Sequence, residues 1–525
     1  MRKAGILMPV YSLPSPYGLG TMGQAAHAFI DFLKQAGQSC WQVLPVGQTG
    51  YGDSPYQSFS SYAGNPYFID LDYLVGDGLL KPEEYQNLDW GSSPEQVDYA
   101  LQYETRYPVL KLAAKRLIAR GDKPFLAFCK EHSFWLEDYA LFMAIKEKND
   151  NKSWYNWPEG ERLRDKKTLE RDKAELKDTV DFWKAVQYLF FRQWNNMKEY
   201  ANSQGISIIG DVPIYVSGDS ADVWANPQEF QLAEDGTPTE VAGCPPDDFC
   251  EDGQLWGNPL FDWEHMKKDG YRWWLSRIEF QFRLYDTLRI DHFRGFEAYY
   301  AIPYGDKTAR NGRWRPGPGI DFFNTVNKKL GRRDIIAEDL GFLTESVFQL
   351  LRDTGYPGMK VLEFAFSSRD QGSNYLPHTY GTHCVVYPGT HDNDTIQGWM
   401  HSAPAKDVKF AKDYLRLNKR EGYHWGMMRG AWSSPADLAV VQMQDVLGLG
   451  SEARMNIPST MGGNWQWRAL PGAFSRKLAK KLHYVMKVYQ RLPEQNPAPK
   501  EETETPSDQT EEKTACDKET KNASR

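Results

Sequence analysis

The stretch "TLRIDHFRGF" (Thr287–Phe296) combines the apolar pattern of a buried strand with an ion pair. Side chains along a strand alternate between two faces, so Arg289 and Asp291 are predicted to share one face. The opposite face then carries Leu288, Ile290 and His292. Buried charges are costly unless they are paired or used in function. We therefore expect the charged face to point into a functional site.

Seven further apolar runs recur along the chain and alternate with helical patterns: Ala4–Val10, Trp41–Val46, Ile206–Ile214, Asp334–Leu340, Met359–Phe364, His383–Asp394 and Asp437–Gly450. Apolar strands that alternate with helices are typical of parallel βαβ units. No glycine fingerprint follows the first strand, which disfavours a dinucleotide-binding sheet. The fold class that we expect is α/β, a (β/α)8 TIM barrel with large insertions between its strands.

The insertions are predicted to belong to a single catalytic domain, residues 1–492. We expect a mainly helical insertion at 72–180 after the second strand, an insertion at 215–275 after the third, and a helical insertion at 395–436 after the seventh. An amphipathic helix precedes the third strand, with core residues at helical spacing: Phe182, Val186, Leu189, Phe190, Trp194 and Met197. Residues 493–525 contain no aromatic residue, Leu, Ile or Val, which predicts a disordered acidic tail.

The composition of the chain indicates which kinds of molecule it can bind. The net charge of −8 argues against nucleic acid. Aromatic residues make up 14% of the chain, which fits either a large core or a cleft in which rings stack on sugars. The six cysteines are scattered without a CxxC pair, so we expect free thiols in a reducing compartment. The N-terminal apolar run is too short for a signal or a membrane span, so we expect a cytoplasmic protein that does not bind membranes.

Acidic side chains fall at the carboxyl ends of the predicted strands. Asp211, Asp291 and Glu338 each follow an apolar run, and His391 and Asp392 follow another. In a (β/α)8 barrel these ends converge on one face, where catalytic residues from several strands meet. Any one acid by itself would be explained by a helix cap or a loop salt bridge. Acids at four strand ends instead indicate a shared site.

Cleavage of a glycosidic bond suits this arrangement, because it needs two carboxyl groups flanking the scissile oxygen. A neighbouring arginine such as Arg289 would keep a nucleophilic carboxylate ionised. A carboxyl group crowded by other acids holds its proton more tightly, which suits proton donation. A metal site is the competing interpretation, with these candidate ligands for Mg²⁺ or Zn²⁺: His391, Asp392, Asp394, Asp211 and Glu338.

The sequence motifs at these strand ends resemble those of a known family. "GDVPIYV", "LRIDHFRG", "IIAEDLG" and "GTHDND" are similar to the four ordered motifs of the α-amylase clan, and in particular to the amylomaltases, or 4-α-glucanotransferases. Four further stretches strengthen the resemblance: "DSPYQSFSSYAGNPYFIDL", "GCPPDDF", "QLWGNPLFDW" and "RMNIPSTMGGNWQWR". The similarity extends over roughly Lys3 to Leu492, nearly all of the chain that is predicted to be ordered.

The resemblance implies roles for individual residues. Asp291 would be the nucleophile that forms a glucosyl-enzyme, Glu338 the general acid and then the general base. Asp392 would bind hydroxyl groups of the distorted sugar, and Arg289 would orient and ionise Asp291. The remaining residues implied in substrate binding are Asp211, His292 and His391 around the reacting glucose, Tyr56 and Trp256 along the glucan groove, and Asn464 near the site.

The resemblance implies a retaining transfer of α-1,4-glucan segments from a donor maltooligosaccharide to the 4-hydroxyl of glucose or another glucan. It implies no cofactor, no metal and no obligatory protein partner. A hydrolase or debranching enzyme of the same clan and a non-catalytic glucan-binding protein stay as alternatives. The loop "GCPPDDFC" (Gly243–Cys250) is a candidate lid over the site, although Cys244 and Cys250 stand where small residues are expected.

Overall fold

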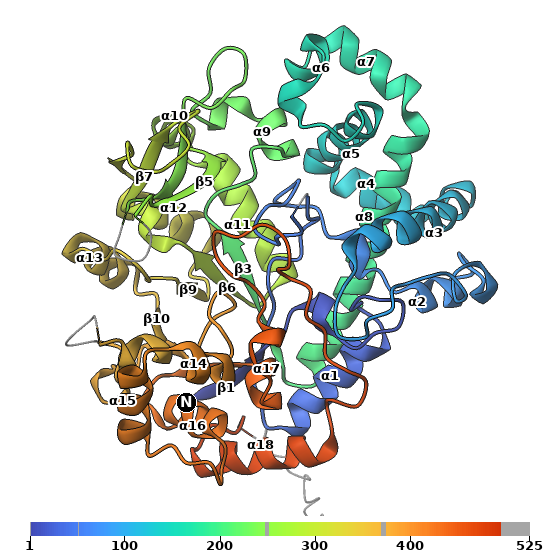
Figure 1. The fold of residues 1–525 in the computed structure, drawn as a ribbon. Coiled ribbons are helices and arrows are strands. Elements are labelled where there is room, and N and C mark those ends of the chain that lie inside the picture. The colour runs from blue at the N-terminus through green and yellow to red at the C-terminus, as the bar shows by residue number, and fades with distance from the viewer. Residues whose placement is uncertain (1, 51, 247–250, 369–373, 495–525) are drawn as a thin grey trace, which may run out of the picture. The chain divides into compact units, whose positions relative to one another are not determined.

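An eight-stranded parallel sheet lies at the centre of the computed structural model, which describes residues 2–50, 52–246, 251–368 and 374–494 (Figure 1). Its strands are β1 (Lys3–Leu7), β2 (Cys40–Gln42), β3 (Ser207–Pro213), β6 (Thr287–Asp291), β9 (Ile335–Ala337), β10 (Gly358–Val361), β11 (Cys384–Tyr387) and β12 (Leu438–Gln442). Hydrogen bonds connect them in the order β10-β11-β12-β1-β2-β3-β6-β9. The Ala337 N–H donates to the Pro357 carbonyl at 3.0 Å, which brings the two edges of the sheet together.

This nearly closed parallel barrel confirms the predicted fold class, and each predicted run overlaps one observed strand. Both faces of the barrel strands are covered, which is why they read as apolar runs. In β6, Leu288 and Ile290 are buried, and so is Arg289 between them. The sheet register places Arg289 directly beside Asp211 of β3. That register decides which charges meet inside the barrel.

Helices follow the barrel strands in chain order. After β1 comes α1 (Gln24–Gln35), and after β2 come α2 (Leu71–Gly76), α3 (Tyr99–Ala119), α4 (Lys123–Glu131), α5 (Ser133–Lys148), α6 (Glu159–Arg162), α7 (Lys166–Glu175) and α8 (Lys177–Ser203). After β3 come α9 (Ala221–Ala225), α10 (Trp263–Asp269) and α11 (Arg272–Leu284). After β6 comes α12 (Gly319–Leu330), and after β9 comes α13 (Glu345–Thr354). After β11 come α14 (Ile396–Ser402), α15 (Ala405–Leu415) and α16 (Tyr423–Ser433), and after β12 come α17 (Met443–Leu447) and α18 (Arg476–Val488).

Helix α8 carries the predicted apolar stripe, and all six of its predicted core residues are buried. The Phe190 ring lies against Gly64, where an added Cβ would come within 2.1 Å of the ring. The Trp194 indole donates to the Leu284 carbonyl at 3.0 Å. Helix α8 thereby joins the loop after β2 to helix α11. In the described part of the chain no helix is both long and apolar enough to cross a membrane.

A second sheet was not foreseen from the sequence. Its strands β4 (Glu240–Cys244), β5 (Gln254–Pro259), β7 (Ala298–Pro303) and β8 (Arg313–Pro316) pair antiparallel in the order β5-β4-β7-β8. Two of these strands come from the segment after β3 and two from the segment after β6. The candidate lid loop joins β4 to β5, but its residues 247–250 lie outside the described chain. The tail from 495 onward also lies outside it, and the predicted insertion boundaries stay predictions.

Candidate active site

A buried ion-pair network lies on the inner face of strands β3 and β6. One guanidinium nitrogen of Arg289, Nη1, is 2.7 Å from both carboxylate oxygens of Asp211 and 2.9 Å from Oδ1 of Asp291. Burial works against the charge of Arg289, yet the two carboxylates raise its pKa well above the usual value. Arg289 therefore stays a cation beside Asp291. These ion pairs explain why strand β6 can carry two charged side chains on its inner face.

Glu338 directly follows strand β9 and lies beside the end of β6. Its Oε2 accepts the backbone N–H of His292 at 2.7 Å, and its Oε1 accepts the N–H of Leu340 at 2.9 Å. Burial, followed by the charge of Asp291, raises the pKa of Glu338 above its usual range. Arg289 and the two backbone donors only partly oppose this shift. The site thus holds one carboxyl group that keeps its proton next to one that is paired with an arginine.

His292 does not continue the strand, so the prediction that it shares a face with Leu288 and Ile290 is wrong. Strand β6 ends at Asp291, and His292 has a left-handed backbone with φ of 54°. After this turn its ring lies perpendicular to that of Trp256, with ring centroids 4.8 Å apart. Burial lowers the pKa of His292 to about 4, which keeps the imidazole neutral. Its Nε2 has no hydrogen-bond partner among the described residues.

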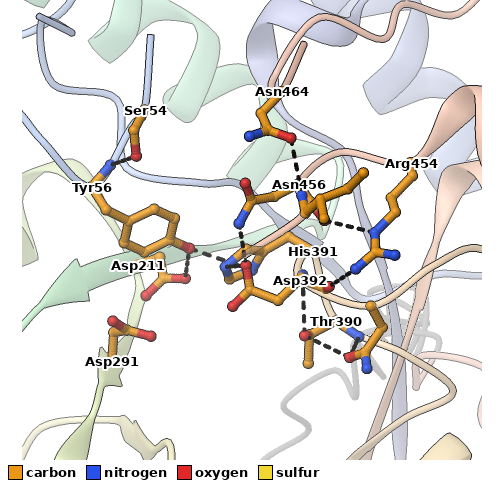
Figure 2. A network of polar contacts seen from close by, with 12 residues as sticks. Ser54, Tyr56, Asp211, Asp291, Thr390, His391, Asp392, Arg454, Asn456 and Asn464 are labelled. Atoms are coloured by element: carbon orange, nitrogen blue, oxygen red, sulfur yellow. Dashed lines mark hydrogen bonds and ion pairs between the residues drawn. The ribbon is translucent and has the colours of Figure 1, made fainter. Parts of the chain in front are cut away.

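Tyr56 connects the ion-pair network to His391, as Figure 2 shows. Its hydroxyl donates to Oδ2 of Asp211 at 2.8 Å and lies 3.4 Å from Nδ1 of His391. The two rings stack with centroids 5.0 Å apart and an interplanar angle of 20°. Tyr56 and Asp211 also line a cavity of about 50 Å³, which is room for a few waters. The loop after β2 therefore reaches the acids at the barrel mouth.

Asp392 follows strand β11 and is more open than the other acids, with a side chain 48% exposed. Its Oδ1 accepts a hydrogen bond from Nδ2 of Asn456 at 2.7 Å and lies 3.5 Å from Nε2 of His391. Arg454 donates to the backbone carbonyl of Asp392 at 2.7 Å (Figure 2). Asn464, one of the predicted binding residues, lies in the loop that also carries Arg454 and Asn456. Its side chain binds the backbone of that loop by accepting the N–H of Ile457 at 3.0 Å.

The structure therefore brings together Asp291, Glu338 and Asp392, the three acids predicted to be catalytic, and most of the predicted binding residues. Arg454 and Asn456 were missed as individual residues, although both belong to the quoted stretch "RMNIPSTMGGNWQWR". Among the described residues no three His, Cys, Asp or Glu side chains are placed to hold a metal ion. The carboxylate oxygens of Asp211, Glu338 and Asp394 instead accept hydrogen bonds from arginine, tyrosine, serine and backbone donors. One oxygen of Asp392 accepts from asparagine.

Comparison with known proteins gives matches along the whole barrel. The sequence profile described as 4-alpha-glucanotransferase matches residues 8–472. A 4-alpha-glucanotransferase of Clostridium butyricum is 49% identical over 486 residues, which covers 92% of this chain and 100% of that protein. One of Streptococcus pneumoniae serotype 4 is 46% identical over 496 residues, covering 94% and 98%. The amylomaltase of Streptococcus agalactiae, solved in complex with acarbose, superimposes with a TM-score of 0.92 at 41% identity, covering 94% and 100%.

Proposed function

This chain belongs to the 4-alpha-glucanotransferase family, and we propose that Asp291 and Glu338 carry out its transfer reaction by a retaining double displacement. The donor is a maltooligosaccharide or a longer α-1,4-glucan, and the acceptor is the 4-hydroxyl of glucose or of another glucan. One observation carries the assignment: Glu338, whose pKa is raised, binds the backbone N–H next to Asp291, whose carboxylate is paired with Arg289. These are the two unlike carboxyl groups that retention requires.

The first half of the reaction breaks the donor's glycosidic bond. The protonated carboxyl group of Glu338 donates its proton to the departing 4-oxygen. The Asp291 carboxylate attacks the anomeric carbon, and the bond to the leaving fragment breaks as the bond to Asp291 forms. Arg289 pairs with the Asp291 carboxylate at 2.9 Å and orients it for the attack. The products are a shortened glucan with a free 4-hydroxyl and a covalent glucosyl-enzyme.

The second half reverses these steps with a new acceptor. Glu338, now a carboxylate, takes the proton of the acceptor's 4-hydroxyl, and that oxygen attacks the anomeric carbon. The bond to Asp291 breaks, so two inversions restore the α configuration. A sugar hydroxyl competes with water because a bound acceptor is already oriented, which gives it a high effective concentration. The half-buried Trp256 ring offers a face on which an acceptor or donor sugar can stack.

The other side chains bind the reacting glucose. Asp392 has a half-exposed carboxylate that binds hydroxyl groups of this sugar, and such contacts strengthen as the ring distorts towards the transition state. His391 and the neutral His292 add ring nitrogens on either side. Tyr56 holds Asp211 and His391 at fixed positions through its hydroxyl. Asn464 shapes the loop beside Asp392, and it contributes to binding through that loop.

Incubation with maltotriose tests the proposal most simply. A transferase produces free glucose together with a ladder of longer chains, at a constant number of glycosidic bonds. A hydrolase of the same clan produces glucose and maltose with a rising number of reducing ends. A binding protein changes nothing. Net hydrolysis without chain lengthening, or no turnover at all, would overturn the proposal.

We also propose that the enzyme is located in the cytoplasm. Cys40, Cys129 and Cys384 are thiols rather than disulfides, and burial raises the pKa of each to about 11, which keeps it unreactive. Such cysteines suit a reducing compartment. No nucleic acid, membrane or obligatory protein partner enters the proposal. Cell fractionation that recovers the activity in an oxidising compartment would contradict it.

A further inference from the structure

The carboxylate of Asp392 lies on a loop, and a second loop holds it there. Asn456 Nδ2 donates to Oδ1 of Asp392 at 2.7 Å, across 64 residues of sequence. His391 Nε2 approaches the same oxygen at 3.5 Å. Both protein contacts therefore fall on Oδ1, and no contact from a described residue is recorded for Oδ2 of Asp392 (Figure 2). One oxygen is thus fixed, while the side chain as a whole stays 48% exposed.

Asn456 is itself held rigidly in place. The Arg454 Nε donates to the Asn456 carbonyl at 2.7 Å, while its Nη2 donates to the Asp392 carbonyl at 2.7 Å. Arg454 therefore joins the backbones of both hydrogen-bonding partners. The next residue, Ile457, donates its N–H to Asn464 Oδ1 at 3.0 Å. The amide of Asn456 consequently meets Asp392 from a backbone that is fixed on two sides.

The chemistry of an amide donor explains why asparagine is suited to this place. A neutral donor orients a carboxylate without neutralising it, so the free oxygen still accepts strongly from sugar hydroxyls. Hydrogen bonds to a charged group are stronger than those between neutral groups. A half-exposed carboxylate without such a partner would rotate among several rotamers. Its free oxygen would then be correctly aimed for only part of the time.

From this geometry we infer that Asn456 is a positioning residue for the transfer reaction: it fixes Oδ1 of Asp392 and thereby aims Oδ2 at the hydroxyl groups of the reacting glucose. The inference rests on the proposed role of Asp392. Asn456 acts through Asp392, and Arg454 fixes the distance between the two backbones. The contacts with the hydroxyls matter most in the transition state. Loss of the amide therefore lowers kcat more than it changes KM for the donor.

Kinetics of Asn456→Ala test the inference on maltotriose disproportionation. We expect kcat to fall about 10- to 100-fold, the range for losing one hydrogen bond to a charged group, with KM changed less than about threefold. The matched control is Asn311→Ala, because Asn311 donates to an Asp306 carboxylate at 3.0 Å on an exposed loop. That control should keep normal kinetics. A normal kcat for Asn456→Ala would overturn the inference.

A double-mutant cycle separates positioning from a general effect on folding. In the background of Asp392→Asn, the further change Asn456→Ala should lower the residual rate less than about threefold, because the carboxylate through which it acts is already gone. A residue that only supports the fold would cause the same fold loss in both backgrounds. Equal losses in the two backgrounds would overturn the inference.

The pH profile of Asn456→Asp gives an independent readout. This variant places a second carboxylate against Asp392, and two such groups share one proton at low pH. The shared proton replaces the amide hydrogen, so the variant keeps more of the wild-type rate at pH 5 than at pH 8. A rate ratio of variant to wild type that does not depend on pH would count against the inference. If wild-type protein fails to disproportionate maltotriose, the proposed function fails; if it succeeds and these variants behave as wild type, only the role of Asn456 fails.

Discussion

The two sides of the site are built in different ways. Asp211, Arg289 and Asp291 lie on neighbouring strands whose register fixes their contacts, and Arg289 and Asp211 are almost fully buried. Asp392 instead lies on a loop after β11, half exposed, and is held by a second loop far away in the sequence. The comparison teaches that this fold fixes the proposed nucleophile, Asp291, by its strands and the proposed hydroxyl-binding acid, Asp392, by its loops.

The difference has a physical consequence for each side. The strand side contains charges that would be costly to leave unpaired, so its geometry cannot change without a large loss of stability. The loop side is in contact with water, so a substitution there leaves no buried unpaired charge and costs little folding free energy. We therefore expect substitutions on the strand side to affect both stability and chemistry. Substitutions on the loop side should affect chemistry alone.

The largest effect is expected for Asp291→Asn. The amide cannot form the glucosyl-enzyme, so kcat should fall by about 10⁴-fold or more. In the truncated variant Asp291→Gly, which leaves space where the carboxylate was, azide should restore turnover and give a product of inverted configuration. Chromatography and NMR of the products check this. Turnover near the wild-type rate without azide would contradict the role of Asp291.

A large but substrate-dependent effect is expected for Glu338→Gln. Loss of the proton donor should lower the rate with maltooligosaccharides by about 10²- to 10⁴-fold. The first step with a glycosyl fluoride should be spared, because fluoride leaves without a proton. Since burial raises the pKa of Glu338, the wild-type rate should fall on the alkaline side as this proton is lost. The variant should lack that alkaline fall, and an equal loss with both donors would contradict the assignment.

Stability measurements distinguish the two sides directly. Arg289→Ala leaves Asp211 and Asp291 unpaired beside each other, which should lower the free energy of unfolding by about 3–5 kcal/mol. Asp392→Asn removes only a half-exposed charge, so it should change stability by less than about 1 kcal/mol. Urea unfolding at neutral pH checks both variants. Similar losses for the two would show that the sides are not built differently.

A last effect depends on pH and concerns a buried carboxyl group beside the loop that carries Asp392. Glu363 is 5% exposed, and an added Cβ at Gly389 would lie 3.2 Å from its Oε1. Burial, followed by the charges of Asp445 and Asp394, raises the pKa of Glu363 well above its usual value. The folded protein therefore keeps a proton that the unfolded chain loses above about pH 4.5, so this group's contribution to stability declines as pH rises.

Glu363→Gln cannot lose that proton. Its free energy of unfolding, relative to wild type, should therefore increase between pH 5 and pH 8, by up to about 1.4 kcal/mol per pH unit. Urea unfolding at several pH values measures this difference. Glu345→Gln is the control, because that side chain is 80% exposed. A difference for Glu363→Gln that stays constant with pH would contradict the account.

The sequence was most informative where local pattern determines structure. Eight apolar runs predicted eight strands, and acids at their carboxyl ends predicted which side chains meet, because parallel strands converge there. The antiparallel sheet was missed, since its short strands alternate too little to stand out from loops. His292 was misplaced because a left-handed residue ends the alternation of a strand. Asn456 was missed because its partner lies 64 residues away, a contact that no local pattern reveals.

Trapping the covalent intermediate tests the central claim most directly. The enzyme is incubated with a donor fluoride whose fluorinated sugar ring slows the second step, then digested and examined by mass spectrometry. We expect one glycosyl group on the peptide that contains Asp291, and its loss after addition of an acceptor. A glycosyl group on Glu338 or Asp392, or turnover with no covalent species, would contradict the account.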